Sequence, residues 1–273
     1  MAVAALVNAV ARKAILAAAD SPRVRRLVRR HGMRLGAARF VAGETLDEAV
    51  RVLRGLNEQG LKANTTLLGE HVADRAETLA VVEEYGLVLE RIAADGLRAN
   101  VALKLTHLGL LLDPELAYEN VSRLVALAAG LGNFVRIDME ESRHVDATLE
   151  TYRRLREAGH DNVGTVLQAY LYRSEADLDA LLPLAPNLRL VKGAYLEPPE
   201  VAFPQKGDVD AAFLRLVERS LAGEGYTAVA THDEDAIRHV LGLGAAQDRF
   251  ELQMLYGVRP QLQLDLVRQG HTV

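Results

Sequence analysis

The sequence predicts an α/β fold of the (β/α)8-barrel type, and two observations support this prediction. Short apolar runs typical of buried parallel strands recur seven times after residue 60, about 31 residues apart, which is the length of one βα unit. Helical patterns occupy most of the intervals between these runs. A doubly wound sheet shows the same alternation, so it stays the alternative architecture.

The predicted elements follow one another in a regular order. The strands cover residues 63–68, 100–105, 134–139, 163–169, 188–192, 228–231 and 250–255. The helices between them cover residues 76–93, 115–129, 146–158, 175–182, 209–221 and 233–243. We therefore divide the chain into an N-terminal helical segment, residues 1–60, and a catalytic barrel domain, residues 61–273.

The N-terminal segment differs from the rest of the chain in charge. Residues 1–31 hold seven basic residues and one acidic residue, so they carry +6 and the remainder carries −11. Arg12 and Lys13 interrupt the apolar stretch at residues 1–19, which is too short and too charged to span a bilayer. An amphipathic helix with this composition could contact an anionic membrane surface, or it could pack on the acidic body with its basic face in solvent.

The composition excludes several classes of function. The chain has 273 residues, of which 49% are hydrophobic, and this is enough for one large core. Its net charge of −5 provides no global basic field for nucleic acid. Because the chain has no cysteine, disulfides, a thiolate nucleophile and a cysteine-bound metal or cofactor are excluded. This composition fits a reducing cytoplasm.

The last residues, 271–273, look like the start of another strand. A closed eight-stranded barrel needs that strand and the helix after it, because an open edge leaves backbone groups unpaired. We therefore expect the final strand and helix to be missing from this chain, so that the barrel domain is incomplete at its C-terminal end.

Polar residues follow the predicted strands one after another. Catalytic groups in barrels of this type lie at the C-terminal ends of the strands, which here hold Glu70, Lys104, Asp138, Gln168, Lys192, Thr231, His232 and Gln253. The cations Lys104, Arg189 and Lys192 suit an anionic ligand or a cofactor that becomes anionic on reduction. We expect Asp138 to form an ion pair with Lys104 and to fix its position.

A metal centre is the competing interpretation of these residues. Its ligands would come from Asp138, Glu140, Glu141, His144, His232 and Asp233. The sequence has no HxH or HExxH motif, and the nearby cations oppose a metal ion, so we expect no catalytic metal. The phosphate-binding glycine motifs and the Gly-x-Ser-x-Gly elbow of serine hydrolases are also absent.

Several motifs together resemble proline dehydrogenase, and the resemblance runs from about residue 30 to the end of the chain. The motifs are LRLVKGAY at residues 188–195, RIDME at 136–140, LQAY at 167–170, ATH at 230–232, ELQMLYG at 251–257, FVAG at 40–43 and LLGE at 67–70. The chain looks most similar to the short, monofunctional bacterial members of this family.

The resemblance implies a distorted (β/α)8 TIM-type barrel preceded by helices, with non-covalent FAD over the strand ends. It implies proline catabolism, in which L-proline is oxidised to Δ1-pyrroline-5-carboxylate. A hydride would pass from the ring carbon next to nitrogen to flavin N5, and a membrane quinone would reoxidise the flavin. Such a flavoprotein would work in the cytoplasm or as a peripheral protein on the inner face of the membrane.

The resemblance also implies roles for individual residues. Asp138 and Arg189 are the candidate catalytic residues, with Arg189 near flavin N5 and Asp138 holding Lys104. The candidate substrate-binding residues are Lys104, Tyr195, Leu255 and Glu70. Lys104 would meet the proline carboxylate, Tyr195 and Leu255 would border the proline ring, and Glu70 would be a gate carboxylate. The candidate FAD-binding residues are Met139, Gln168, Arg189, Lys192, Gly193, Ala194, Thr231, His232 and Gln253.

The chain departs from this family at its C-terminal end. The missing strand and helix bring the family a tyrosine and an Arg-Arg pair that holds the substrate carboxylate, and one of these arginines pairs at the position of Glu70. We therefore expect Glu70 to lack its partner and Lys104 to meet the carboxylate alone. Two alternatives stay open, namely another flavin barrel such as a methylenetetrahydrofolate reductase and a catalytically impaired barrel fragment. The segment at residues 197–208 could be a mobile lid or an ordinary long loop.

Overall fold

A computed structural model describes residues 39–273, which form two compact units. The described part of the first unit consists of residues 39–49 and Leu255–Val258. The second, called the sheet unit here, consists of Val50–Met254 and Arg259–Val273. The predicted basic segment at residues 1–31 lies outside the described residues.

A capping box starts helix α3 (Leu46–Glu58), which begins in the first unit and continues into the sheet unit. The Glu48 amide donates to Thr45 Oγ1 at 3.3 Å, and the Thr45 amide donates to Glu48 Oε2 at 3.3 Å. Arg39 Nε donates to the carbonyl of Gly257 at 3.0 Å and joins the two ends of the first unit. α3 is the described part of the helical segment that we expect at residues 1–60.

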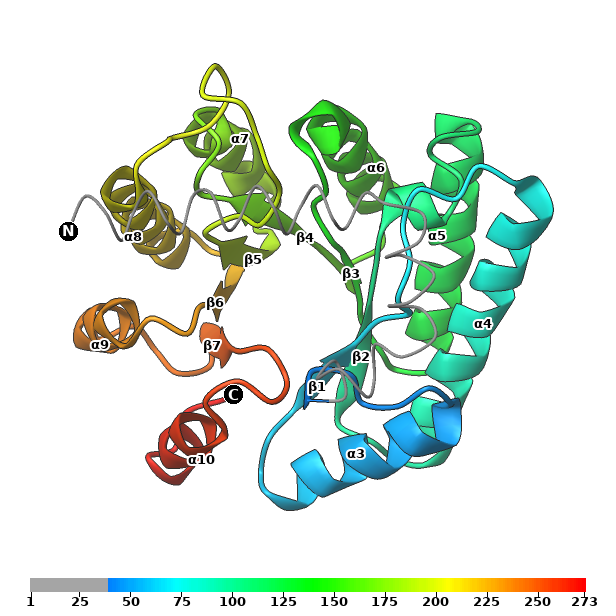
Figure 1. The fold of residues 1–273 in the computed structure, drawn as a ribbon, viewed down its shortest axis with the longest axis horizontal. Helices are drawn as coiled ribbons and strands as arrows, with labels where there is room; N and C mark the ends of the chain where they lie inside the picture. Colours follow the sequence, from blue (N-terminus) through cyan, green and yellow to red (C-terminus); the bar gives the residue numbers. More distant parts are fainter. Residues whose placement is uncertain (1–38) are drawn as a thin grey trace, which may run out of the picture. The chain divides into compact units, whose positions relative to one another are not determined.

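The sheet unit contains one parallel sheet of seven strands in the order β1-β2-β3-β4-β5-β6-β7 (Figure 1). The strands are β1 (Ala63–Thr65), β2 (Ala99–Leu103), β3 (Val135–Ile137), β4 (Val163–Gln168), β5 (Asn187–Val191), β6 (Tyr226–Ala230) and β7 (Phe250–Gln253). This sequential order confirms the barrel-type prediction and excludes a doubly wound sheet, in which the strand order reverses.

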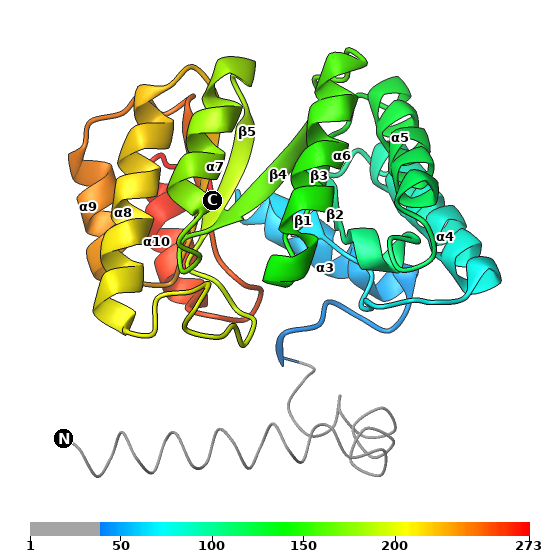
Figure 2. The ribbon, with the colours of Figure 1, turned by 90° about the horizontal axis from the view of Figure 1, so that it is seen from above.

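Helices follow the strands and cover the outer face of the curled sheet, as Figures 1 and 2 show. They are α4 (Arg75–Ala94), α5 (Pro114–Gly130), α6 (Val145–Glu157), α7 (Ser174–Leu181), α8 (Lys206–Ala222), α9 (Glu234–Gly242) and α10 (Pro260–Arg268). Fully buried side chains such as Tyr85, Tyr152 and Phe213 form the layer between helices and sheet. α10 completes the seventh βα unit, although its helical pattern is missing from the predicted set.

The predicted strand boundaries are correct within a few residues, and the differences have local causes. β1 ends at Thr65 because the next residues bind a helix instead of the sheet. Thr66 Oγ1 lies 3.2 Å from the hydroxyl of Tyr85 in α4, and the Leu67 amide donates to the same hydroxyl at 3.3 Å. α9 begins one residue later than predicted because Asp233 is its N-cap and accepts from the amides of Asp235 and Ala236.

The last two residues lie beside β7, as expected for the start of another strand. The Leu252 amide donates to the carbonyl of Thr272 at 2.9 Å, and the Lys62 amide donates to the carbonyl of Val273 at 2.9 Å. Residues 272 and 273 therefore connect β7 with the residues before β1. In a parallel barrel this is the place of the eighth strand.

Candidate active site

Arg189 in β5 is the centre of the polar interior at the strand ends. Its Nη1 donates to Asp138 Oδ1 at 2.5 Å, its Nε to Gln253 Oε1 at 2.7 Å and its Nη2 to Asn64 Oδ1 at 2.6 Å. These partners follow β3, end β7 and lie in β1, so one guanidinium joins four strands. The side chains of Arg189 and Asp138 are 13% and 21% exposed. Arg189 can do this because its planar group carries five N–H donors.

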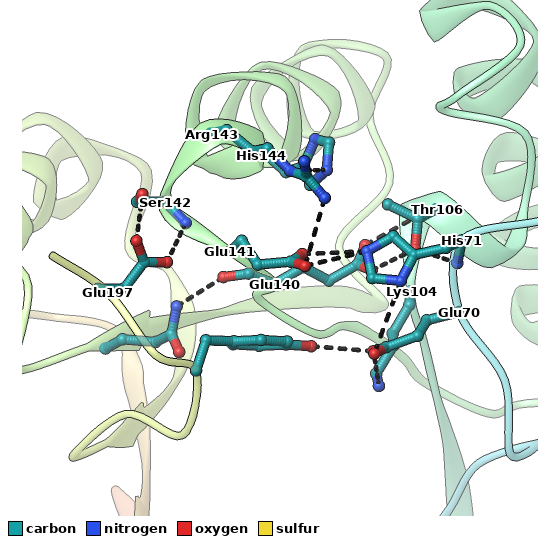
Figure 3. Close-up of polar contacts among 12 residues, drawn as sticks. Glu70, His71, Lys104, Thr106, Glu140, Glu141, Ser142, Arg143, His144 and Glu197 are labelled. Carbon is teal, nitrogen blue, oxygen red and sulfur yellow. Dashed lines mark hydrogen bonds and ion pairs between the residues drawn. The ribbon is translucent and has the colours of Figure 1, made fainter. Parts of the chain in front are cut away.

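The predicted ion pair between Asp138 and Lys104 is wrong. Asp138 pairs with Arg189, and Lys104 Nζ instead donates to Glu70 Oε2 at 2.6 Å (Figure 3). The reason is reach, because the long side chain of Arg189 extends across the interior to Asp138, whereas the loop after β1 brings Glu70 to Lys104. The expectation that Glu70 has no partner is therefore also wrong, whereas the contact of Lys104 with the proline carboxylate stays a prediction.

Glu70 has a second partner in Tyr195, whose hydroxyl donates to Glu70 Oε2 at 3.1 Å. Burial raises the pKa of Glu70, but the hydrogen bond and charge of Lys104 outweigh it, so the pKa lies below its usual value. Burial and the charge of Glu70 both raise the pKa of Tyr195. This part of the site therefore holds an ionised carboxylate and a protonated phenol at neutral pH.

Lys192, directly after β5, lies between two carboxylates. Its Nζ donates to Asp210 Oδ1 at 2.5 Å and to Asp233 Oδ2 at 2.6 Å. Burial lowers the pKa of Lys192, but the hydrogen bonds to these two carboxylates outweigh burial and the pKa is raised. Because Asp233 also caps α9, Lys192 connects β5 to the start of that helix.

Gln168 and Met139 are buried beside Glu140, which sequence reasoning considered only as a metal ligand. Gln168 Nε2 donates to the carbonyl of Glu140 at 2.8 Å. The Glu140 carboxylate accepts from the amide of Thr106 at 3.0 Å and from its hydroxyl. Burial raises the pKa of Glu140, and the two bonds from Thr106 only partly oppose this. Complete burial next to Lys104 is the signal that distinguishes Glu140 from an ordinary surface acid, and it is not visible in the sequence.

Gly193 is required by packing within the protein. Its φ of +119° is in the region that favours glycine. A Cβ atom there would lie 2.4 Å from the ring of Tyr170. Close approach of a cofactor is thus not needed to explain this glycine. Ala194, the next residue, is exposed.

The ends of β6 and β7 are joined to each other. The Thr231 amide donates to the carbonyl of Gln253 at 3.1 Å, and Thr231 Oγ1 accepts from the amide of Asp233 at 3.2 Å. Burial, and then the charge of Arg259, lower the pKa of His232. His232 is therefore neutral at pH 7 and lies in the field of a cation.

The other predicted features have different outcomes. Leu255 belongs to the first unit, is 66% exposed, and its substrate contact stays a prediction. The segment at residues 197–208 is anchored, because Glu197 accepts from the amide and hydroxyl of Ser142 at 2.6 Å each. The Phe203 amide also donates to the carbonyl of Tyr170 at 2.8 Å. These contacts hold the segment at both places, and its role as a mobile lid stays a prediction.

The structure does not gather the metal ligands that the sequence suggested. Asp138 is held by Arg189, Asp233 by Lys192, and Glu140 by Thr106. Only Glu141 and His144 of that set come together, and they do so with His71, which sequence reasoning did not consider.

Comparison with known proteins identifies the family. The proline dehydrogenase family model matches residues 49–273. The chain is 42% identical to a proline dehydrogenase of Deinococcus radiodurans, over 98% of this chain and 89% of that protein. It is 43% identical to proline dehydrogenase 1 of Bacillus subtilis strain 168, over 88% of this chain and 81% of the relative. The bifunctional protein PutA of Escherichia coli is 28% identical, and the match spans 20% of its length.

A solved structure supports the fold. Proline utilization A from Bdellovibrio bacteriovorus matches with a TM-score of 0.79 and 23% identity, over 86% of this chain and 30% of that one. The resemblance to the short members of the family is confirmed, since these are matched over most of their length. The alternative of a methylenetetrahydrofolate reductase is wrong, because the matching family is a different one. The chain belongs to the proline dehydrogenase family and is an oxidoreductase of the α/β-barrel type.

Proposed function

We propose that this chain oxidises L-proline to Δ1-pyrroline-5-carboxylate with non-covalently bound FAD, whose electrons pass to a membrane quinone. The observation that carries the proposal is the pair of ionic groups at the strand ends. Arg189 with Asp138 forms one group, and Lys104 with Glu70 forms the other. The relatives from D. radiodurans and B. subtilis are named proline dehydrogenases, and the same substrate is proposed here.

The residues at the ends of β3 to β7 have the chemistry to hold a flavin cofactor. Three of the five N–H groups of Arg189 are used by protein acceptors, so two donors are left for a ring that becomes anionic on reduction. Met139, Gln168, Gln253, Lys192, Gly193 and Ala194 would border the ring system. Thr231 and His232, near the cation of Arg259, would hold the phosphate and ribitol portion. FAD would supply the acceptor for the hydride from proline.

The chain's own residues would bind and orient the substrate. The proline carboxylate would take the place of Glu70 at the ammonium of Lys104. If Glu70 stayed there, the two carboxylates would repel each other beside one cation. Glu70, released from Lys104, keeps the hydrogen bond from Tyr195 and so acts as a gate. Tyr195 would also border the proline ring. Asp138 would act as a positioning residue because it fixes the guanidinium of Arg189.

An anaerobic visible spectrum before and after L-proline tests this function. A flavin band that bleaches with proline supports cofactor, substrate and direction together. A flavin band that persists supports the alternative of a catalytically impaired barrel. If the protein shows no flavin band even after FAD is added, the proposal is wrong.

We also propose that the basic N-terminal segment brings the enzyme to the inner face of an anionic membrane, where a quinone is available. The described helices include none that is long and apolar enough to cross a bilayer. The support is the +6 charge of residues 1–31, which is worth about 1 kcal/mol per basic residue near an anionic surface. Binding to anionic but not neutral vesicles, weakened by salt, is expected. Equal binding to both kinds of vesicle would contradict this role.

A further inference from the structure

Three metal-ligating side chains meet beside the proposed substrate site. His71 lies in the loop after β1, and Glu141 and His144 lie in the loop between β3 and α6 (Figure 3). One ligand atom from each lies within 4.8 Å of the others. His71 Nε2 is 3.0 Å from Glu141 Oε1, and the two imidazole rings are 6.5 Å apart between centroids. The proposed reaction uses none of these three residues.

A cationic group already binds to this cluster. Arg143 Nε donates to His144 Nε2 at 3.0 Å, and its Nη2 lies 3.4 Å from Glu141 Oε1. Because a guanidinium can only donate, His144 Nε2 must be unprotonated with its lone pair directed at Arg143. The side chain of Arg143 is 65% exposed, so it can turn into solvent and leave the acceptors to another cation.

The backbone holds the three ligands in place. The His71 amide donates to Thr106 Oγ1 at 3.0 Å, and His71 keeps a φ of +59°, which is uncommon for a residue with a side chain. The loop with Glu141 and His144 is held at Ser142, whose amide donates to Glu197 at 2.6 Å. Fixed ligand positions reduce the ordering that metal binding requires.

The second nitrogen of His71 faces a carboxylate. Nδ1 of His71 lies 3.7 Å from Glu70 Oε1. Carboxylates that accept a hydrogen bond from this nitrogen orient metal-bound imidazoles in many proteins, and at 3.7 Å Glu70 lies just beyond that distance. Glu70 is also the partner of Lys104, so the cluster is linked to the residue that we expect to meet the proline carboxylate.

We propose that His71, Glu141 and His144 bind a divalent transition-metal ion such as Zn²⁺, with water in the remaining position. Two imidazoles and one carboxylate are a common set for zinc, and hard ions such as Mg²⁺ and Ca²⁺ prefer oxygen ligands. Because this ion would draw Glu70 toward His71, its binding would weaken the Glu70–Lys104 pair and lower the KM for proline, whose carboxylate has to replace Glu70 at Lys104. The effect on KM rests on the proposed function, whereas metal binding does not.

Calorimetric titration of the full-length protein with Zn²⁺, after dialysis against a chelator, tests the site. One ion per chain is expected, with a Kd on the order of 10 μM. His71→Asn, which tolerates the positive φ, and His144→Gln should each weaken binding at least about tenfold. His239→Gln is the matched control, because His239 pairs with Glu218 at 2.7 Å on α8 and α9, and it should bind as the parent does.

Arg143→Gln gives a result that misfolding cannot imitate. Removing the competing guanidinium should tighten Zn²⁺ binding severalfold. The site is refuted if the parent binds no Zn²⁺, if the His71 and His144 variants bind as the parent does, or if Arg143→Gln weakens binding. If Zn²⁺ binds as expected but leaves the KM for proline unchanged, the link to Glu70 is refuted and the metal site stands.

Discussion

The pairing of Asp138 with Arg189 can be measured by a double-mutant cycle on protein stability. Asp138→Asn removes the charge of a carboxylate that is 21% exposed and 2.5 Å from Nη1 of Arg189. A hydrogen bond between charged groups contributes about 1.5–3 kcal/mol, and partial exposure places this pair below the ~3–5 kcal/mol lost on breaking a fully buried one. We expect Asp138→Asn to cost about 2 kcal/mol.

Arg189→Met should cost more than Asp138→Asn, about 3 kcal/mol, because it also leaves the side chains of Gln253 and Asn64 without their donor. If the two residues form one pair, the double variant should be more stable than the sum of the single effects predicts. The expected coupling energy is about 1.5–2 kcal/mol.

Urea unfolding of the parent, both single variants and the double variant measures this coupling. The same cycle with Lys104→Met in place of Arg189→Met is the control, and we expect its coupling with Asp138→Asn to be below about 0.5 kcal/mol. A large coupling between Asp138 and Lys104, together with a small one between Asp138 and Arg189, would refute the geometry described for the site.

Three further predictions follow from the described contacts. Glu70→Gln should lower stability at pH 7 by less than about 1 kcal/mol, because the Glu70–Lys104 pair is partly exposed to solvent. Since the pKa of Glu70 is lowered from 4.5, the stability difference between parent and variant should be present above pH 4.5. It should vanish as the pH falls through the folded-state pKa, which urea unfolding at several pH values measures. Gly193→Ala should destabilise by roughly 2–4 kcal/mol through its positive φ and its clash with Tyr170, whereas Gly207→Ala, with open space around it, should be neutral or slightly stabilising in thermal unfolding. Glu197→Ala should speed proteolysis within residues 197–208, because this segment loses both of its hydrogen bonds to Ser142. The same change at the exposed Glu200 should leave the rate of proteolysis unchanged.

The strands could be predicted from the sequence because buried parallel strands are nearly continuous apolar runs. Their ends are less predictable, since they depend on side chains from other elements. β1 stops at Thr65 because the hydroxyl of Tyr85, in a helix that begins ten residues later, binds Thr66 and Leu67. No local pattern at residues 63–68 indicates this contact.

The residues at the strand ends were also predictable, but their partners were not. Strand order alone places Lys104, Asp138 and Lys192 along one edge of the sheet. Which charge meets which depends on curvature and on the length of each side chain. Arg189 bonds to Asn64, 125 residues earlier in the chain, because the sheet curls enough to bring the interiors of β5 and β1 together. His71 was missed for a similar reason, since it gathers with Glu141 and His144 only through the relative position of two loops.

The pairing of charges changes how an anionic ligand would bind. Each of the cations Lys104, Arg189 and Lys192 is already paired with at least one carboxylate. A proline carboxylate therefore does not fill a vacant cationic site, and it has to exchange for a carboxylate of the protein. Glu70 is the carboxylate best suited to leave its cation, because its side chain is 35% exposed, compared with 21% for Asp138. A carboxylate that is already partly in water can move fully into water at little cost in free energy. The exchange replaces one charged contact with a similar one, so we expect the affinity for proline to come mainly from contacts with the ring.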